Sequence, residues 1–67
     1  MKITLYYKVH EDNFEGTVNT YLLHKELEYS NLQKDLNKMA DDSDGEMSYT
    51  PFCICGDNGI ILRFYEK

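Results

Sequence analysis

Two cysteines and two histidines are the residues of this 67-residue chain that could together bind a metal ion. They are Cys53, Cys55, His10 and His24. Two thiols and two imidazoles make the ligand count of a structural zinc site, but zinc motifs separate their paired cysteines by roughly two to four residues on a turn. Cys53 and Cys55 are separated by one residue within an extended apolar segment, where their side chains point the same way about 6.6 Å apart. We therefore expect two free thiols that pack as small apolar residues, and no metal site.

The acidic run from Asp42 to Gly45 has the spacing of the middle of a calcium-binding loop. In that alignment the first and last ligand positions fall on Ala40 and Pro51, which carry no carboxylate. The run therefore predicts a solvent-exposed acidic loop that binds no calcium ion.

Groups that could act in catalysis are sparse. His10 stands beside Glu11 and Asp12, an arrangement suited to proton transfer, but no nucleophile lies near it in the sequence. The four glycines form no phosphate-binding pattern. We predict that the chain is not an enzyme and uses no cofactor.

Carboxylates are the most informative polar groups. Twelve acidic residues against seven basic ones give a net charge of −5, which disfavours direct binding to nucleic acid. Nine of the acids fall in three clusters: Glu11, Asp12 and Glu15; Glu26 and Glu28; and Asp41, Asp42, Asp44 and Glu46. Carboxylates in such rows can imitate the phosphates of a nucleic acid and occupy a basic groove of another protein. The alternative is that they serve solubility, for which −5 is an ordinary charge on a domain of this size.

Tyrosine is the second feature that predicts binding, because six tyrosines exceed what one small core needs. A single helix covers one face of a sheet, so we expect Tyr6, Tyr65, Ile61 and Tyr21 on the uncovered face. Tyr6 and Tyr65 are the aromatic residues we assign to partner binding. A homodimer that covers this face is the alternative use of the same residues.

Two strands are predicted in the first half of the chain. Alternating apolar residues predict a strand over residues 2–10, and the charged residues 11–16 predict a loop. Residues 17–27 predict a second strand, although apolar Leu22 and Leu23 are adjacent. A bulge at this point, or a strand covered on both faces, would explain the adjacent pair.

One helix is predicted to begin at Ser30, which with Gln33 matches a capping box. Leu32, Leu36 and Met39 then form one apolar stripe. The acids of residues 41–45 oppose the helix dipole, so we predict a loop there.

A second hairpin is predicted from residues 47–55 and 60–65, with Pro51 at an edge or a bulge. A two-residue turn at Asn58 and Gly59 would place Cys53 and Cys55 on the same face as Ile60, Leu62 and Phe64. A three-residue turn over 57–59, with a left-handed Gly59, would place Phe52 and Ile54 there instead, and this second register is our prediction.

Together these elements predict one small α+β domain spanning residues 1–67. It is a four-stranded antiparallel sheet with one helix, in the order β-β-α-β-β. The 42% apolar content supports a folded core, and no apolar run approaches the length of a membrane span. Two cysteines are few for a small secreted domain, so we expect a cytoplasmic protein of a bacterial host cell.

The small size, the acidity and a composition typical of AT-rich genes together resemble the general type of phage- or mobile-element-encoded inhibitors, including anti-CRISPR and other anti-defence proteins. No motif matches a named family, so the resemblance assigns no residues. We predict a non-enzymatic inhibitor that blocks a basic surface of a host nuclease or DNA-binding protein. The alternatives are a homo-oligomeric structural or regulatory accessory of the antitoxin type and, less favoured, a small Cys/His metal-binding module.

Overall fold

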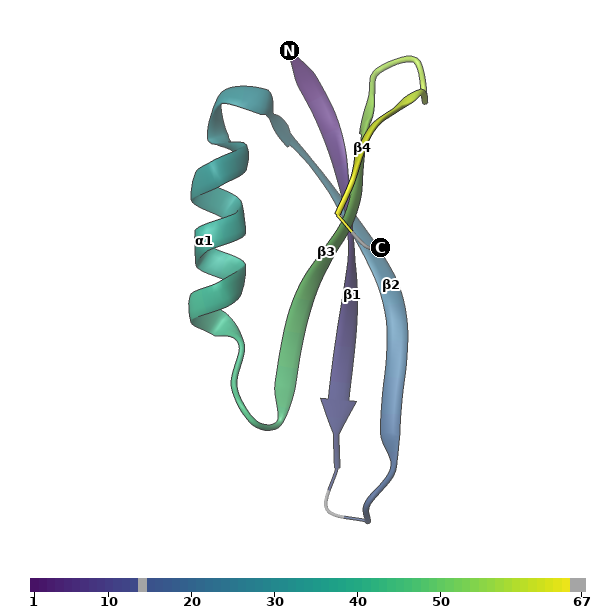
Figure 1. The fold of residues 1–67 in the computed structure, drawn as a ribbon, viewed down its shortest axis with the longest axis vertical. Coiled ribbons are helices and arrows are strands. Elements are labelled where there is room, and N and C mark those ends of the chain that lie inside the picture. The colour runs from purple at the N-terminus through teal and green to yellow at the C-terminus, as the bar shows by residue number, and fades with distance from the viewer. Residues whose placement is uncertain (14, 66–67) are drawn as a thin grey trace.

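The computed structural model describes residues 1–13 and 15–65 (Figure 1). Its elements, in chain order, are β1 (Lys2–Asp12), β2 (Val18–Glu28), a short 3-10 turn η1 (Tyr29–Asn31), α1 (Leu32–Asp42), β3 (Met47–Gly56) and β4 (Ile61–Phe64). The strands form one antiparallel sheet in the order β2-β1-β3-β4. The predicted α+β class and the β-β-α-β-β order are therefore confirmed.

The first hairpin is longer and more regular than predicted. All eleven residues of β1 pair with β2 without a register shift, so a bulge at Leu22 and Leu23 is absent. Glu11 and Asp12 were predicted in a loop but belong to β1. Both sides of the strand are paired at this end, because the Asp12 N–H donates a hydrogen bond of 2.8 Å to the Glu46 carbonyl while β2 continues opposite.

The helix begins later and ends later than predicted. The capping box does not form, because Ser30 lies inside η1 and the N-cap residue is Asn31, without a side-chain cap. At the other end α1 runs through Asp41 and Asp42, which were predicted in a loop. Ser43 ends the helix, since its N–H and hydroxyl donate to the Met39 carbonyl at 3.1 and 2.9 Å. This local capping outweighs an unfavourable dipole term of a few tenths of a kcal/mol.

The core lies between α1 and one face of the sheet. The predicted apolar stripe is confirmed: Leu32 and Met39 are buried and Leu36 packs beside them. They meet strand residues that are at most 1% exposed: Ile3, Leu5 and Ile54. In Figure 1 the helix lies alongside β3, and β1 lies between β3 and β2. The helix therefore covers little of β2.

Two irregularities decide which face each side chain of the second hairpin occupies. The register between β1 and β3 shifts where Tyr6 opposes Cys53 and Tyr7 opposes Pro51, which leaves Phe52 as an extra residue. A bulge at Pro51 was one of the two predicted alternatives, and it is confirmed. Because Phe52 is the extra residue, its ring packs with groups on the sheet face away from α1, where it contacts Lys8.

The turn of this hairpin is the predicted three-residue one. Gly59 has a φ of 80°, and Gly56 donates a hydrogen bond of 3.0 Å to the Ile60 carbonyl. The predicted face alignment is confirmed for Phe52, whose ring packs against Phe64 at a centroid distance of 5.9 Å, but it is wrong for Ile54. Ile54 opposes Arg63 and Cys53 opposes Phe64, because a second register shift leaves Leu62 as an extra residue.

The molecule is elongated, with extents of 42 × 20 × 20 Å. The β1–β2 turn and the α1–β3 connection lie toward one end of the long axis (Figure 1). Within the described residues, the single helix falls short of the length and apolarity that a membrane span requires.

Candidate functional site

Two of the three predicted acidic clusters meet at one end of the molecule. β1 and β3 pair antiparallel, so Glu11 lies opposite Met47, and the hydrogen bond between Asp12 and Glu46 ties the two segments together. The last turn of α1 adds its two aspartates beside this connection. We call this end the acidic pole; its residues are Glu11, Asp12, Glu15, Asp41, Asp42, Asp44 and Glu46.

The acidic pole has few compensating cations: Lys38 lies one turn before Asp41 and Asp42 on α1 and lines a hollow with Asp42 and Lys25, but the connecting segments carry none. Residues 9–24 include no Lys or Arg, and neither do residues 39–62. The pole holds seven of the twelve acidic residues, whereas the remainder of the chain holds five acids and all seven basic residues. The charge of −5 is therefore strongly polarised along the long axis rather than spread over the surface.

The pole is shaped by an ordered connection between α1 and β3. The Asp44 carboxylate accepts hydrogen bonds of 2.8 Å from the backbone N–H groups of Met47 and Glu46, and these bonds lower the pKa of Asp44. A hollow of about 410 Å³ lies between this connection and the end of β1. Its lining residues are Glu11, Asp12, Asn13, Gly45, Glu46 and Met47.

Glu11 is held at the edge of the pole by β2. The Tyr21 hydroxyl donates a hydrogen bond of 2.8 Å to Glu11 Oε1, and this bond raises the pKa of Tyr21. Tyr21 lies opposite Val9 and therefore points to the helix side of the sheet, so its predicted place on the uncovered face is wrong. The uninterrupted β1–β2 register explains the difference.

Glu26 and Glu28 are not brought to the acidic pole. They lie at the far end of β2, where Glu26 is 3.7 Å from Lys2 Nζ and Glu28 is 3.2 Å from the Met1 amine. Such exposed pairs contribute little to stability, about 0–1 kcal/mol. They do offset the charge of both carboxylates, so this end of the molecule presents no row of free acids.

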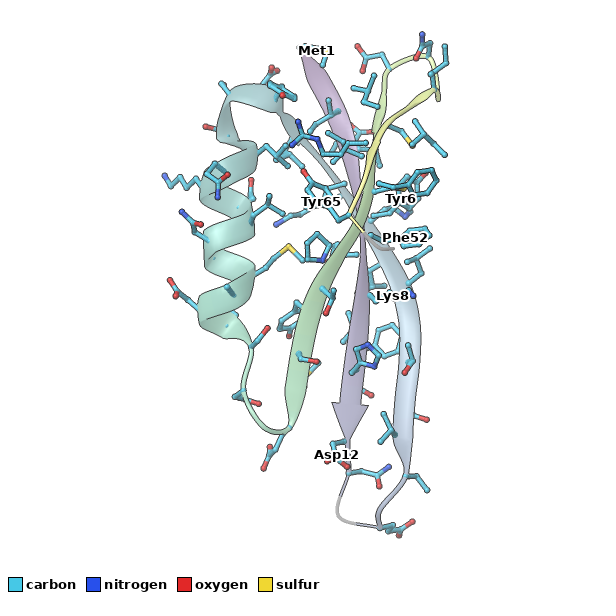
Figure 2. All side chains as sticks on the ribbon, viewed as in Figure 1. Met1, Tyr6, Lys8, Asp12, Phe52 and Tyr65 are labelled. Carbon is cyan, nitrogen blue, oxygen red and sulfur yellow. The ribbon has the colours of Figure 1, made fainter. Side chains whose placement is uncertain are left out.

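The sheet face away from α1, which we call the open face, carries Tyr6 as predicted. The Tyr6 ring packs on His24 at a centroid distance of 5.5 Å. Beside them Phe52 meets Phe64 edge to face at 5.9 Å, and Lys8 Nζ lies 5.3 Å from the centre of the Phe52 ring. Figure 2 shows Tyr6 and Phe52 on the side of the sheet opposite the helix.

Tyr65 does not lie on the open face, and that prediction is wrong. Its N–H donates a hydrogen bond of 2.8 Å to the Phe52 carbonyl, and its ring packs against the core cluster on the helix side (Figure 2). The register shift at Leu62 is the physical reason, because it moves every later residue of the strand to the opposite face. Ile61 lies opposite Cys55 and remains exposed, as predicted.

The cysteines and histidines do not form one site. Among residues 1–13 and 15–65, no three His, Cys, Asp or Glu side chains are grouped to hold a metal ion. Both cysteines are free; Cys53 is 5% exposed, and burial together with the nearby Cys55 raises its pKa. His10 Nδ1 lies 3.0 Å from Thr20 Oγ1, away from both thiols in the strand pairing.

Sequence reasoning did not single out Phe52, Phe64 or Lys8 as surface residues of one cluster. Pro51 was the available signal, since it predicted a bulge and a bulge reverses the facing of its neighbours. The sequence also did not predict that Leu22 and Leu23 would both be exposed.

Comparisons of the chain with protein-family models, with curated proteins and with solved structures found no match. The functional argument is therefore made from the residues and their arrangement.

Proposed function

We propose that the chain is a non-enzymatic protein-binding inhibitor whose acidic pole occupies a basic, nucleic-acid-binding surface of a partner protein. The partner is a nuclease or DNA-binding protein in the cytoplasm of a bacterial host, and the inhibitor is of the anti-defence type that phages and mobile elements encode. The observation that supports this proposal is the convergence of seven carboxylates at one end, where residues 9–24 and 39–62 contain no Lys or Arg.

A polarised charge of this kind acts first on the rate of encounter. Opposite potentials steer two proteins together and orient them, and the effect weakens as salt shortens the Debye length, which is about 10 Å at 0.1 M. The acidic pole would therefore enter the groove of the partner first, with the long axis of the inhibitor pointing into it.

Tyr6 and its neighbours on the open face would supply the short-range contacts. Aromatic rings are frequent binding anchors, and Phe64 beside them is 57% exposed. In this mechanism the carboxylates govern association and salt dependence, while the rings govern dissociation.

The test compares two variants with equal charge removal. The first carries Asp41→Asn, Asp42→Asn and Glu46→Gln in the acidic pole. The control carries Glu26→Gln, Glu28→Gln and Asp57→Asn outside it. Asp44 is left intact in both, because its carboxylate orders the connection.

Each protein is immobilised and used to capture proteins from a bacterial lysate at about 0.05 and 0.3 M salt, followed by mass spectrometry. We expect the wild-type and control chains to enrich the same nuclease or DNA-binding protein, and the pole variant to lose it. A duplex oligonucleotide should compete for the captured protein. Equal retention by the pole variant, or capture that is unaffected by both salt and duplex, would contradict the proposal.

A further inference from the structure

β2 is exposed on both of its faces. Leu22 is 49% exposed on the open face, and Leu23 is 42% exposed on the helix side. Val18 and Tyr21 are exposed as well. The adjacent leucines fit a strand that is covered on both faces, yet α1 lies beside β3, and only Lys25 and Leu27 of β2 pack toward the helix and core (Figure 1). A strand added alongside β2 would flank side chains on both faces at once, whereas packing on the open face would leave Leu23 and Tyr21 in solvent.

The outer edge of β2 lacks most of the usual protection against pairing, because its charged residues, Lys25, Glu26 and Glu28, are confined to its last four positions. Natural edge strands are short, bulged or interrupted by Pro, or they carry charged side chains. β2 has eleven residues, pairs with β1 without a bulge, and contains no Pro or Gly. Its single lysine, Lys25, is turned toward the helix, where Nζ lies 3.0 Å from Asp35 Oδ1. The other edge strand, β4, has only four residues and an irregular register.

The folded surface is also large for a monomer. The chain exposes 4907 Å², whereas a compact monomer of 7.9 kDa exposes about 4,400 Å². A stable interface removes about 800 Å² from each partner. Dimerisation would therefore bury more than the whole surplus of about 500 Å². Every folded copy presents this β2 edge. A second copy is therefore a partner that is present wherever the protein itself is present.

We propose that β2 pairs antiparallel with β2 of a second copy, about a two-fold axis at Leu23, to form an eight-stranded sheet in the order β4-β3-β1-β2-β2-β1-β3-β4. Leu23 is the central residue of β2, so this register alone pairs the strand over its whole length. It places Leu22 opposite His24 of the partner subunit and Tyr21 opposite Lys25 of the partner subunit.

The charges of the chain favour this antiparallel arrangement. No like charges stand directly opposite each other, because the residues of β2 before Lys25 are uncharged and face the charged half of the other copy. Each acidic pole lies beside the end of the other copy at which the Met1 amine and Lys2 offset the charges of Glu28 and Glu26. A parallel pairing would instead place both acidic poles side by side, which costs repulsion.

The axis residue gives a direct test by analytical ultracentrifugation or light scattering. The wild-type chain at on the order of 10–100 µM should have twice the monomer mass of 7.9 kDa. Leu23→Lys places two ammonium groups opposite each other at the axis and should weaken dimerisation about tenfold or more. Leu23→Glu should do the same, and an equimolar mixture of the two variants should form a dimer again.

The matched control is Leu62→Lys, the same change at a residue of similar exposure, 48%, near the other edge. It should remain dimeric. Circular dichroism checks that each variant is folded. We expect it to be, because Leu23 is exposed in the single chain and its replacement disturbs no core contact. A monomeric wild-type chain, a dimer that survives Leu23→Lys, or a mixture of the two charged variants that stays monomeric would each overturn the proposal. None of these results depends on the proposed inhibitor function.

Discussion

Replacing Ile54 with valine tests which face of the sheet holds the core. Ile54 is 1% exposed, lies opposite Leu5 and packs in the cluster that includes Leu32 and Met39. Removing one methylene from such a buried isoleucine costs about 0.5–1.5 kcal/mol. Ile61 offers the same substitution on β4 at 47% exposure, where we expect a cost below about 0.5 kcal/mol.

These costs are large relative to the stability of so small a domain. A chain of 67 residues is expected to have an unfolding free energy of about 3–10 kcal/mol. A loss of about 1 kcal/mol lowers the Tm of a domain of this size by about 4–8 °C. We therefore expect Ile54→Val to lower Tm by about 2–12 °C, and by more than Ile61→Val, whose effect should stay below about 4 °C.

The assay is thermal unfolding followed by circular dichroism, with all proteins at one concentration because self-association would raise Tm. Both substitutions lie outside β2, so the β2 edge is the same in each protein. A loss at Ile61 that equals or exceeds the loss at Ile54 would refute the reasoning, because it would mean that the open face is the buried one.

Three further predictions concern the turns and the thiols. Hydrogen bonds from the backbone lower the pKa of Asp44, so its contribution to stability is present above its ordinary pKa and is lost as the pH falls through the lowered value. In an acid titration of unfolding free energy, Asp44→Asn should keep the acceptor oxygen and flatten this dependence, and an unchanged profile would contradict the assignment. Gly59→Ala should cost about 1 kcal/mol or more in urea unfolding because of its φ of 80°, whereas Gly45→Ala, with open space around it, should be nearly neutral; equal effects would be inconsistent with the turn. Cys55 should be alkylated before Cys53, which is buried and has a raised pKa, as peptide mass spectrometry can show; a faster Cys53 would contradict its burial.

The parts of the fold that could be predicted are those indicated by the local periodicity of apolar residues. Alternation over Ile3, Leu5 and Val9 correctly identified the buried face of β1, and the helical stripe ending at Met39 correctly identified the buried face of α1. Both patterns follow from backbone geometry alone, with a period of two for strands and of 3.6 for helices.

The facing of the second hairpin could not be predicted, because it depends on bulges that form between strands. The three-residue turn at Gly59 was predicted from its residues, but the register shift at Leu62 reverses the face of Tyr65. Nothing in the local sequence of β4 marks that shift. Pro51 did mark the other one, since its missing N–H is a local chemical fact.

The C-terminal end of the helix was predicted wrongly because only the helix-dipole effect was considered. The cap at Ser43 was not identified from the sequence. Asp41 and Asp42 oppose the helix dipole by a few tenths of a kcal/mol each. The Ser43 hydroxyl bonds to the Met39 carbonyl at 2.9 Å and accepts a hydrogen bond of the same length from Tyr49 N–H. The second of these bonds comes from β3, so its weight was not visible in the helix sequence.

The acidic pole was predicted as two separate clusters. Their meeting follows from the pairing of β1 with β3, which places Glu11 opposite Met47. A β-β-α-β-β order is compatible with more than one strand order, so residue types alone do not say which clusters become neighbours. The charge could be predicted from the sequence, but its polarisation required the sheet topology.

The two proposed surfaces are physically independent, and this makes their combination testable. The acidic pole is built at the ends of β1, α1 and β3, whereas the proposed dimer uses the outer edge of β2. Antiparallel pairing would leave the two poles at opposite ends of the dimer, each free to enter a basic groove. Leu23→Lys should therefore leave the affinity of a single pole unchanged while removing the gain from two linked poles, and the pole variant should lose partner binding while it remains a dimer. If either variant abolished both properties while remaining folded, one shared surface would have to serve both, and the separation of edge and pole would be wrong.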